Sequence, residues 1–315
     1  MSQSSVGNSH HVKILVLGSG PAGLSAALYA ARAELAPVVL TGVQLGGQVA
    51  LTYTVENYPG FPEGVGGGQL GELFQKQAEH FGARVEFDTA NRVDFSQRPF
   101  KVKTDGGEYL ADSVIVATGA SPNQLKVPGE NELTGRGVSY CATCDGWFFK
   151  DRKVIIVGGG DSALEEGLFI TRYASSVTII HRREELRASP VLQKRAAEHP
   201  RVSFIWNTVI TEVVGSDKVE AVRLKNLKTG GETVLQTDGA FIFIGHTPNT
   251  QMFKGQLEMD NRGYLKINDR MQTSVPGVFA GGEAADPNFR QVVTSAGMGA
   301  AAAIEATRYL EAQGE

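Results

Sequence analysis

Two short apolar runs along the chain each lead into a glycine-rich turn. The first run, VKILVL, starts at Val12 and leads into GSGPAG at residues 18–23. The second run, VIIV, starts at Val154 and leads into GGGDSA at residues 158–163. Apolar runs of this length bounded by glycine are typical of buried strands. The pattern therefore predicts a buried strand followed by a tight turn at two places in the chain.

After each turn the apolar residues take the spacing of one face of a helix, and we predict that the helices begin at Leu24 and Leu164. A strand, a G-x-G-x-x-G or G-x-G-x-x-A turn and a helix form the dinucleotide-binding fingerprint. Its glycines allow the tight turn and the close approach of a pyrophosphate, which then lies at the positive N-terminus of the helix. One such turn is weak evidence. Two, one in each half of the chain, predict two dinucleotides in two α/β domains.

The residues after the next strand indicate which dinucleotide the second turn binds. Four basic residues follow the strand predicted at residues 177–180: His181, Arg182, Arg183 and, one helical turn further, Arg187. Arginine at this point of the fold accommodates the 2′-phosphate of NADP, because its guanidinium binds phosphate in a bidentate way. Glutamates at positions 184 and 185 leave a solvated helix start of mixed charge as the alternative. We favour the phosphate site and predict that the second domain binds NADPH.

The first domain lacks this signal. The strand predicted at residues 37–40 ends in Thr41 and Gly42, so there is neither an acidic residue to bind the ribose nor a basic residue to bind its 2′-phosphate. The segment 46–60 is long, irregular and rich in glycine, proline and polar residues, which is typical of a functional loop. The fingerprint by itself therefore leaves the first dinucleotide unidentified.

The chain has two cysteines, Cys141 and Cys144, with two residues between them. A structural disulfide closing so short a loop would stabilise the fold little, because the stabilisation grows with loop length. A zinc site would need four ligands, and the sequence has no second CxxC or HxxxH pair, so we expect no metal. A redox-active pair is the leading interpretation.

Length, charge and termini limit the class of protein. With 315 residues the chain has room for two domains, and its formal charge of −4 gives no overall attraction to nucleic acid or to an anionic membrane. Residues 1–11 are polar, without the apolar core of a signal peptide, and we expect them to be a disordered lead-in. No segment approaches the roughly 20 apolar residues of a membrane helix. These features point to the cytoplasm.

Together these segments resemble the low-molecular-weight, NADPH-dependent thioredoxin reductases of bacteria and plants. The resemblance includes CATCDG at residues 141–146 and the run from 277 to 299, and it extends in order over about residues 12–310. It implies two Rossmann-like domains, with an NADPH domain at 121–245 inserted into a discontinuous FAD domain at 1–120 and 246–315. It also implies a homodimer that reduces thioredoxin or a similar small redox protein.

The resemblance assigns roles to individual residues. The expected FAD contacts are Gly18, Gly20, Pro21, Ala22, Gly23, Gly46, Gly47, Gln48, Asn57, Ala117, Thr118, Gly119, Gly282, Glu283, Arg290 and Gln291. The expected NADPH contacts are Gly158, Gly160, Asp161, Ser162, Ala163, His181, Arg182, Arg183 and Arg187. The expected catalytic residues are Cys141, Cys144 and Asp145. Cys144 would lie next to the flavin, and Cys141 would attack the substrate disulfide.

Three of these assignments have particular consequences. The family has aspartate where Glu283 stands; the longer side chain keeps the charge, so we expect FAD to remain bound, somewhat less tightly. Asp145 is expected to be the general acid and base for the thiols, with a turn-forming role before Gly146 as the alternative. Two apolar runs, 115–119 and 241–245, are expected to cross between the domains, with ordinary core strands as the alternative.

The implied reaction is a thioredoxin-disulfide reductase reaction, in which hydride passes from NADPH to FAD, then to the Cys141–Cys144 disulfide and on to thioredoxin by thiol–disulfide exchange. A flavin-dependent dithiol oxidase of the same superfamily would not need NADPH, so the intact second fingerprint argues against it. A redox sensor without turnover is the alternative from another class of protein.

Overall fold

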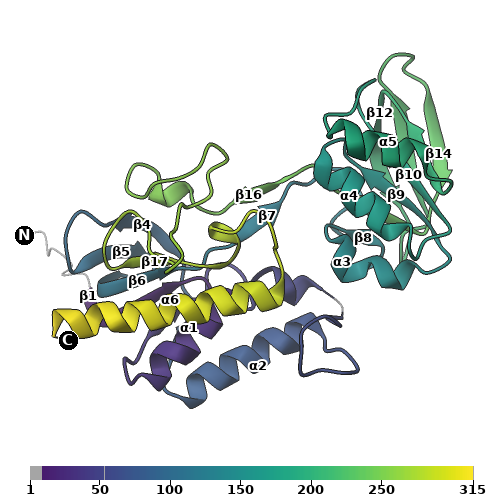
Figure 1. Ribbon diagram of the computed structural model, residues 1–315. Helices are drawn as coiled ribbons and strands as arrows, with labels where there is room; N and C mark the ends of the chain where they lie inside the picture. Colours follow the sequence, from purple (N-terminus) through teal and green to yellow (C-terminus); the bar gives the residue numbers. More distant parts are fainter. Residues whose placement is uncertain (1–8, 53, 315) are drawn as a thin grey trace, which may run out of the picture. The chain divides into compact units, whose positions relative to one another are not determined.

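The computed structural model describes residues 9–52 and 54–314 (Figure 1). The chain divides into two compact units, which we call unit one (Met1–Ser121 with Thr247–Glu315) and unit two (Pro122–His246). Each boundary lies one residue later than the sequence analysis places it. Within the described ranges, no helix is long and apolar enough to cross a membrane.

Unit one is built on a seven-stranded sheet. Its strands are β1 (Ser9–Leu17), β2 (Val38–Leu40), β3 (Arg84–Glu86), β4 (Ala90–Asp94), β5 (Phe100–Thr104), β6 (Glu108–Val116) and β17 (Val278–Ala280). They lie in the order β3-β2-β1-β6-β5-β4, with β17 beside β6. The pairs among β1, β2, β3, β6 and β17 are parallel, whereas β5 and β4 are added antiparallel at one edge. Residues 14–17 of β1 are buried on both faces of the sheet, which explains why this part of its sequence is continuously apolar.

The helices α1 (Pro21–Arg32), α2 (Gly67–His80) and α6 (Val292–Gln313) cover one face of this sheet, with α1 and α6 central. The unit also contains the 3-10 turns η1 (Gly47–Leu51), η3 (Gln251–Phe253) and η4 (Gly282–Ala284). Phe253 of η3 and Ala284 of η4 belong to the core on the opposite face. Ile14 and Val16 of β1 pack against alanines of α1 and α6, which lie side by side in Figure 1. The two helices approach so closely that a Cβ at Gly299 would overlap the carbonyl oxygen of Ala22. Small residues thus place the N-terminus of α1 against α6.

Unit two contains a five-stranded parallel sheet, in the order β11-β10-β9-β15-β8. Its strands are β8 (Val138–Ser139), β9 (Lys153–Val157), β10 (Ser176–Ile180), β11 (Val202–Ile205) and β15 (Gly239–Ile242). One face packs on the helices α3 (Ala142–Asp145), η2 (Gly146–Phe149), α4 (Asp161–Ile170) and α5 (Pro190–Glu198). The other face packs on an antiparallel sheet of β12 (Thr208–Val214), β13 (Ala221–Asn226) and β14 (Glu232–Gln236). Side chains of β9 alternate between these two cores, with Ile156 in the first and Ile155 in the second.

The helices begin earlier than the apolar spacing indicates. The α1 helix starts at Pro21 and α4 starts at Asp161, so the predicted starts at Leu24 and Leu164 are wrong by one turn. Proline is well tolerated at the first helical position, where no intrahelical N–H bond is needed. The first turn of each helix consists of small or polar residues, so it carries no apolar periodicity that could reveal it.

Three further expectations differ from the structure. Ser9–His11 belong to β1, so the lead-in cannot extend over residues 9–11, and residues 1–8 lie outside the described part of the chain. Arg187 does not follow Arg183 on a helix, because α5 begins only at Pro190. The irregular segment 46–60 includes the 3-10 turn η1.

The strands that cross between the units are not the apolar runs expected at 115–119 and 241–245. These runs contain the ends of the sheet strands β6 and β15, so the alternative of core strands is correct there. The crossing segments are β7 (Ala120–Pro122) and β16 (His246–Pro248), which pair with each other as a separate two-stranded sheet. Gly119 and Gly245, with φ of 67° and 105°, make the turns into them.

Candidate active site

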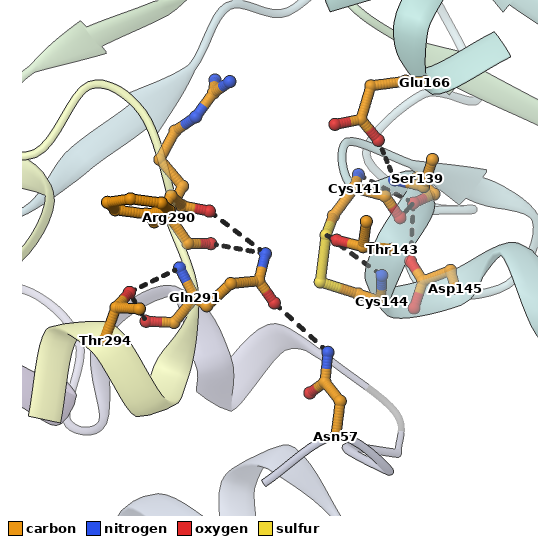
Figure 2. Close-up of a disulfide and its surroundings, with 12 residues drawn as sticks. Asn57, Ser139, Cys141, Thr143, Cys144, Asp145, Glu166, Arg290, Gln291 and Thr294 are labelled. Atoms are coloured by element: carbon orange, nitrogen blue, oxygen red, sulfur yellow. Dashed lines mark hydrogen bonds between the residues drawn. A yellow bond between two sulfur atoms is a disulfide. The ribbon is translucent and has the colours of Figure 1, made fainter. Parts of the chain in front are cut away.

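Cys141 and Cys144 form a disulfide at the start of α3, with their Cα atoms 5.3 Å apart (Figure 2). Cys141 is the N-cap residue of this short helix, and its Sγ accepts a hydrogen bond from the backbone N–H of Cys144 at 3.2 Å. The hydroxyl of Thr143 lies 3.4 Å from the same sulfur. Hydrogen bonds to the charged form of a group favour that form. Once the disulfide is reduced, these donors would therefore stabilise a thiolate on Cys141.

Asp145 is the last residue of α3 and lies in the same turn as Cys144. Its Oδ2 accepts a hydrogen bond from the hydroxyl of Ser139 at 2.6 Å. Burial raises the pKa of the Asp145 carboxyl, and the hydrogen bond from Ser139 partly opposes this by stabilising the carboxylate. A carboxyl with a raised pKa can hold and release a proton closer to neutral pH, which is what an acid and base for thiols requires.

Two side chains that the sequence analysis missed hold the backbone of this turn. The hydroxyl of Ser139 accepts the N–H of Cys141 at 3.1 Å, and the Glu166 carboxylate accepts the N–H of Ala142 at 3.1 Å. Ser139 is buried at the end of β8, whereas Glu166 reaches the turn from α4. A serine two residues before the CxxC pair was a usable signal. Nothing in the sequence around Glu166 indicates its contact, because only the packing of α4 on α3 creates it.

The glycine-rich turn of unit one leaves space for a ligand. A Cβ at Gly18, which has φ of 109°, would overlap the carbonyl of Ala117, and one at Gly23 would overlap the carbonyl of Gly18. These glycines are therefore needed for close packing of strand, turn and helix. Gly20, the N-cap of α1, instead faces open space, with nothing within 4 Å of an added Cβ. Helix N-termini expose N–H donors that favour phosphate, so this turn fits a dinucleotide pyrophosphate.

Other predicted FAD residues lie around this turn. Gly47 packs against it, because its Cβ would lie 3.0 Å from Gly20 Cα. Thr118 follows β6, and its carbonyl accepts a hydrogen bond from the Asn249 side chain at 3.0 Å. Its buried Oγ1 has no hydrogen-bond partner among the described residues. A buried hydroxyl is normally paired, so this atom fits a site completed by a polar ligand.

The start of α6 brings further predicted FAD residues together (Figure 2). Gln291 and Thr294 form a reciprocal capping box, and the Asn57 amide donates to Gln291 Oε1 at 3.2 Å. Asp286, which the sequence analysis missed, accepts backbone N–H groups of residues 288–290 and so holds the turn where Arg290 has φ of 51°. Two segments far apart in the sequence thus meet at one helix N-terminus.

Glu283 lies in η4, next to Gly282, and is half-buried. Loss of solvation raises the pKa of its carboxyl to about 7, with Asp286 adding to the rise and Arg290 opposing it. The Glu283 carboxyl is therefore partly protonated near neutral pH.

This raised pKa predicts a pH-dependent stability. The folded state holds the Glu283 proton more tightly than the unfolded chain, whose carboxyl has a pKa near 4.5. Tighter binding of this proton by the folded state thus adds to the free energy of unfolding. The addition is complete below pH 4.5 and is lost as the pH rises to about 7. We expect Glu283→Gln to stabilise FAD-free protein relative to wild type at pH 8 by about 1–3 kcal/mol, and little at pH 4.5. Thermal unfolding at both pH values measures this, with the exposed Glu258→Gln as control. An equal effect at both pH values would contradict the assignment.

The glycine-rich turn of unit two is bound to the arginine-bearing loop. The backbone N–H groups of Arg187 and Ala188 both donate to the carbonyl of Gly159, at 2.7 and 3.1 Å. Asp161 Oδ1 accepts the N–H of Ser189 at 2.7 Å. Gly160 is the N-cap of α4 and, like Gly20 in unit one, faces open space. The loop 181–189 therefore lies directly beside the N-terminus where a pyrophosphate would bind.

The basic residues of this loop divide into two kinds. The His181 ring is buried against Gly159, where burial lowers its pKa, and its Nε2 lies 3.1 Å from the carbonyl oxygen of Glu185. It supports the glycine-rich turn as a neutral ring. The three arginines are exposed, and residues 183–187 line a cavity of about 300 Å³. Glu184 forms an ion pair with Lys228, which offsets its negative charge at the edge of this cavity.

Two glycine-rich dinucleotide turns and a CxxC disulfide beside a half-buried acid define a nucleotide-dependent disulfide oxidoreductase. Residues 12–299 match the family model of the pyridine nucleotide-disulphide oxidoreductases. A thioredoxin reductase of Rickettsia felis is 48% identical over 303 residues, covering 95% of this chain and 98% of the relative. One of Mycolicibacterium smegmatis is 47% identical over 302 residues, with 95% and 97% covered. The crystal structure of thioredoxin reductase from Streptococcus pyogenes superposes with a TM-score of 0.92 at 41% identity, covering 97% of this chain and all of that one. The chain belongs to the thioredoxin reductase family of the pyridine nucleotide-disulphide oxidoreductases.

Proposed function

We propose that this protein is a thioredoxin-disulfide reductase that moves electrons from NADPH, by way of FAD, to the Cys141–Cys144 disulfide and on to oxidised thioredoxin. The observation that carries the proposal is the disulfide itself, placed one residue from a half-buried carboxyl with a raised pKa. This is the chemical equipment for thiol–disulfide exchange, which needs a thiolate and a group that moves protons.

Cys141 is the residue that attacks the partner. In the reduced protein its thiolate, stabilised by the N–H of Cys144, bonds to one sulfur of the partner disulfide and releases the other as a thiolate. The Cys144 thiolate then bonds to Cys141 Sγ, which re-forms the disulfide and releases the second partner sulfur. Two electrons leave with the partner, and each released thiolate takes a proton. Asp145 lies where it can supply one and be reprotonated from water.

The two glycine-rich turns bind the nucleotides. In unit one, Gly20 and the N-terminus of α1 would hold the FAD pyrophosphate, with the Thr118 hydroxyl as a further donor. Bound FAD supplies the ring that accepts hydride and passes two electrons to a disulfide. In unit two, Gly160 and α4 would hold the NADPH pyrophosphate, and Arg182, Arg183 and Arg187 its 2′-phosphate.

The surface next to the disulfide supports a protein as the electron acceptor. Trp147 and Phe148 of η2 follow Asp145 closely, and their side chains are 54% and 47% exposed. The Lys150 ammonium lies over the Trp147 ring, 5.6 Å from its centre. Exposed aromatic residues of this kind are enriched at protein–protein interfaces.

Replacing Trp147 and Phe148 should therefore impair the reduction of a protein substrate more than the reduction of a small-molecule disulfide. We expect Trp147→Ala/Phe148→Ala to raise the KM for thioredoxin about tenfold or more, because buried aromatic anchors dominate interface energies. The rate of reduction of a small aromatic disulfide reagent should change less than about twofold. Val191→Ala, at an exposed apolar residue of α5, is the matched control. Equal losses with both substrates would contradict a docking role.

The proposal as a whole is tested by anaerobic titration of the purified yellow protein with NADPH, followed by addition of oxidised thioredoxin. Bleaching of the flavin by NADPH and its return on addition of thioredoxin is the expected result. Bleaching by a dithiol but not by NADPH would favour a flavin-dependent dithiol oxidase. Binding of NADPH without steady-state oxidation would favour a redox sensor.

We also propose that the protein works in the cytoplasm, as the sequence analysis expects, and that it is a homodimer, as the resemblance implies. Light scattering of the purified protein tests its oligomeric state against the 33.7 kDa mass of one chain. Fractionation of cells and detection of the protein tests its compartment.

A further inference from the structure

Ser139 occupies a buried position between the two reactive parts of the site. It ends β8, and its side chain is 4% exposed. Its Oγ accepts the N–H of Cys141 at 3.1 Å and lies 2.6 Å from Asp145 Oδ2 and 3.2 Å from the Cys141 carbonyl oxygen (Figure 2). One hydroxyl thus contacts the backbone of the attacking cysteine and the carboxyl of the acid.

The donors and acceptors of this hydroxyl can be counted for both charge states of Asp145. A serine hydroxyl donates one hydrogen bond and accepts two. While Asp145 is ionised, Ser139 accepts from the Cys141 N–H and donates to the carboxylate. While Asp145 is protonated, its O–H can donate to Ser139 Oγ, and the serine proton turns to the Cys141 carbonyl. Every partner remains satisfied in both states without movement of a heavy atom.

We propose that Ser139 is the positioning residue of the acid, holding the Asp145 carboxyl in one place before and after proton transfer. The inference rests on the proposed function, because it assumes that Asp145 moves protons for the thiols. A group that transfers a proton must keep hydrogen-bonding distance to it, and a small misplacement is costly. A half-buried carboxyl held only by packing would lose this alignment each time its charge changed.

Other titratable groups face this turn from the elements packed against it. Cys141 and Cys144 lie within α3 itself, and Glu166 reaches it from α4, where it accepts the N–H of Ala142. Tyr140 precedes Cys141, but its hydroxyl donates to the buried Glu130 at 2.9 Å, and burial together with this hydrogen bond raises the pKa of Tyr140 well above its usual value. In the described structure the Asp145 carboxylate accepts a hydrogen bond from the Ser139 hydroxyl.

The pH dependence of thioredoxin reduction distinguishes this role from a structural one. As the pH rises, wild-type kcat should fall when Asp145 loses its proton. Asp145→Asn should abolish this high-pH limb of the plot of kcat against pH. Ser139→Ala removes a donor to the carboxylate, so the limb should move to higher pH by about one unit, with kcat about tenfold lower. Ser139→Thr keeps the hydroxyl and should restore the wild-type limb. Ser113→Ala, at a fully buried serine of unit one that donates to the Gly277 carbonyl, is the matched control.

The outcomes separate the inference from the function on which it rests. If Asp145→Asn leaves the pH profile unchanged, the acid role of Asp145 fails. If Asp145→Asn abolishes the limb but Ser139→Ala leaves both limb and kcat as in wild type, the role of Ser139 is overturned. Should Ser139→Ala not fold, infrared spectroscopy of wild-type protein carrying 13C-labelled aspartate provides the second measurement. A carbonyl stretch shifted as it is when the acid O–H donates a hydrogen bond, and absent from Asp145→Asn, supports the inference, and the stretch of an acid without a hydrogen bond contradicts it.

Discussion

Cys144→Ser is expected to reduce NADPH-dependent turnover with thioredoxin by about a thousandfold or more, because serine cannot form the disulfide that carries the electrons. In the structure Cys144 is bonded to Cys141, and the described residues include no free cysteine that could take its place. Steady-state NADPH oxidation with oxidised thioredoxin measures the loss. Flavin content should remain that of wild type, because the change lies in unit two, outside the predicted FAD residues.

Two comparisons make this result specific. Thr143→Ser lies between the two cysteines and keeps a hydroxyl near Cys141 Sγ, so its turnover should stay within about threefold of wild type. Cys141→Ser should lose turnover as Cys144→Ser does. Only Cys144→Ser should form a stable mixed disulfide with thioredoxin, because it retains the attacking sulfur. Turnover of Cys144→Ser above about a tenth of wild type would exclude the proposed path, since a thiol essential for exchange cannot be bypassed.

Arg182→Ala/Arg183→Ala is expected to raise the KM for NADPH about a hundredfold and to change the KM for NADH little. Each charge-assisted bond from arginine to phosphate contributes on the order of 1–2 kcal/mol when the side chain is partly exposed, and NADH lacks the 2′-phosphate. Both arginines are exposed. Their loop is held beside the glycine-rich turn by hydrogen bonds from the N–H groups of Arg187 and Ala188 to the Gly159 carbonyl. Initial rates with each nucleotide, at constant thioredoxin, measure the ratio of the two KM values.

Arg195→Ala is the matched control, because it removes an exposed arginine of α5 in the same unit but outside the loop. It should leave the preference for NADPH unchanged. The difference in KM for NADPH between Arg182→Ala/Arg183→Ala and wild type should shrink as the salt concentration rises, since exposed charges are screened. A parallel loss with NADPH and NADH would mean that the change disturbs the fold rather than a phosphate site.

Much of the fold could be predicted from the chain because its signals are local. The apolar runs before Gly18 and Gly158 are buried strands with parallel neighbours in two sheets, and the α/β fold class is confirmed by the structure and by the relatives. The family was also predicted correctly, since CATCDG and two fingerprints in order are far more specific than any one of them. The contacts of each residue with FAD or NADPH stay predictions.

The errors arose where local pattern carries no information. The helix starts at Pro21 and Asp161 are formed by small and polar residues, and the crossing strands β7 and β16 are too short and too mixed in composition to show a period. The arginine loop was wrongly given helical spacing, because its conformation is imposed by hydrogen bonds to Gly159 rather than by its own residues.

The sequence by itself determined the architecture, the redox pair and the preference for a phosphorylated nucleotide, because strand burial, turn glycines and charged side chains are properties of neighbouring residues. Only the tertiary structure decided how the acid is held. Ser139 on β8, Asp145 at the end of α3 and Glu166 on α4 meet around one turn although no spacing links them. The raised pKa of Asp145 likewise comes from the protein packed around it, since burial is a property of the whole unit and not of the segment that carries the carboxyl.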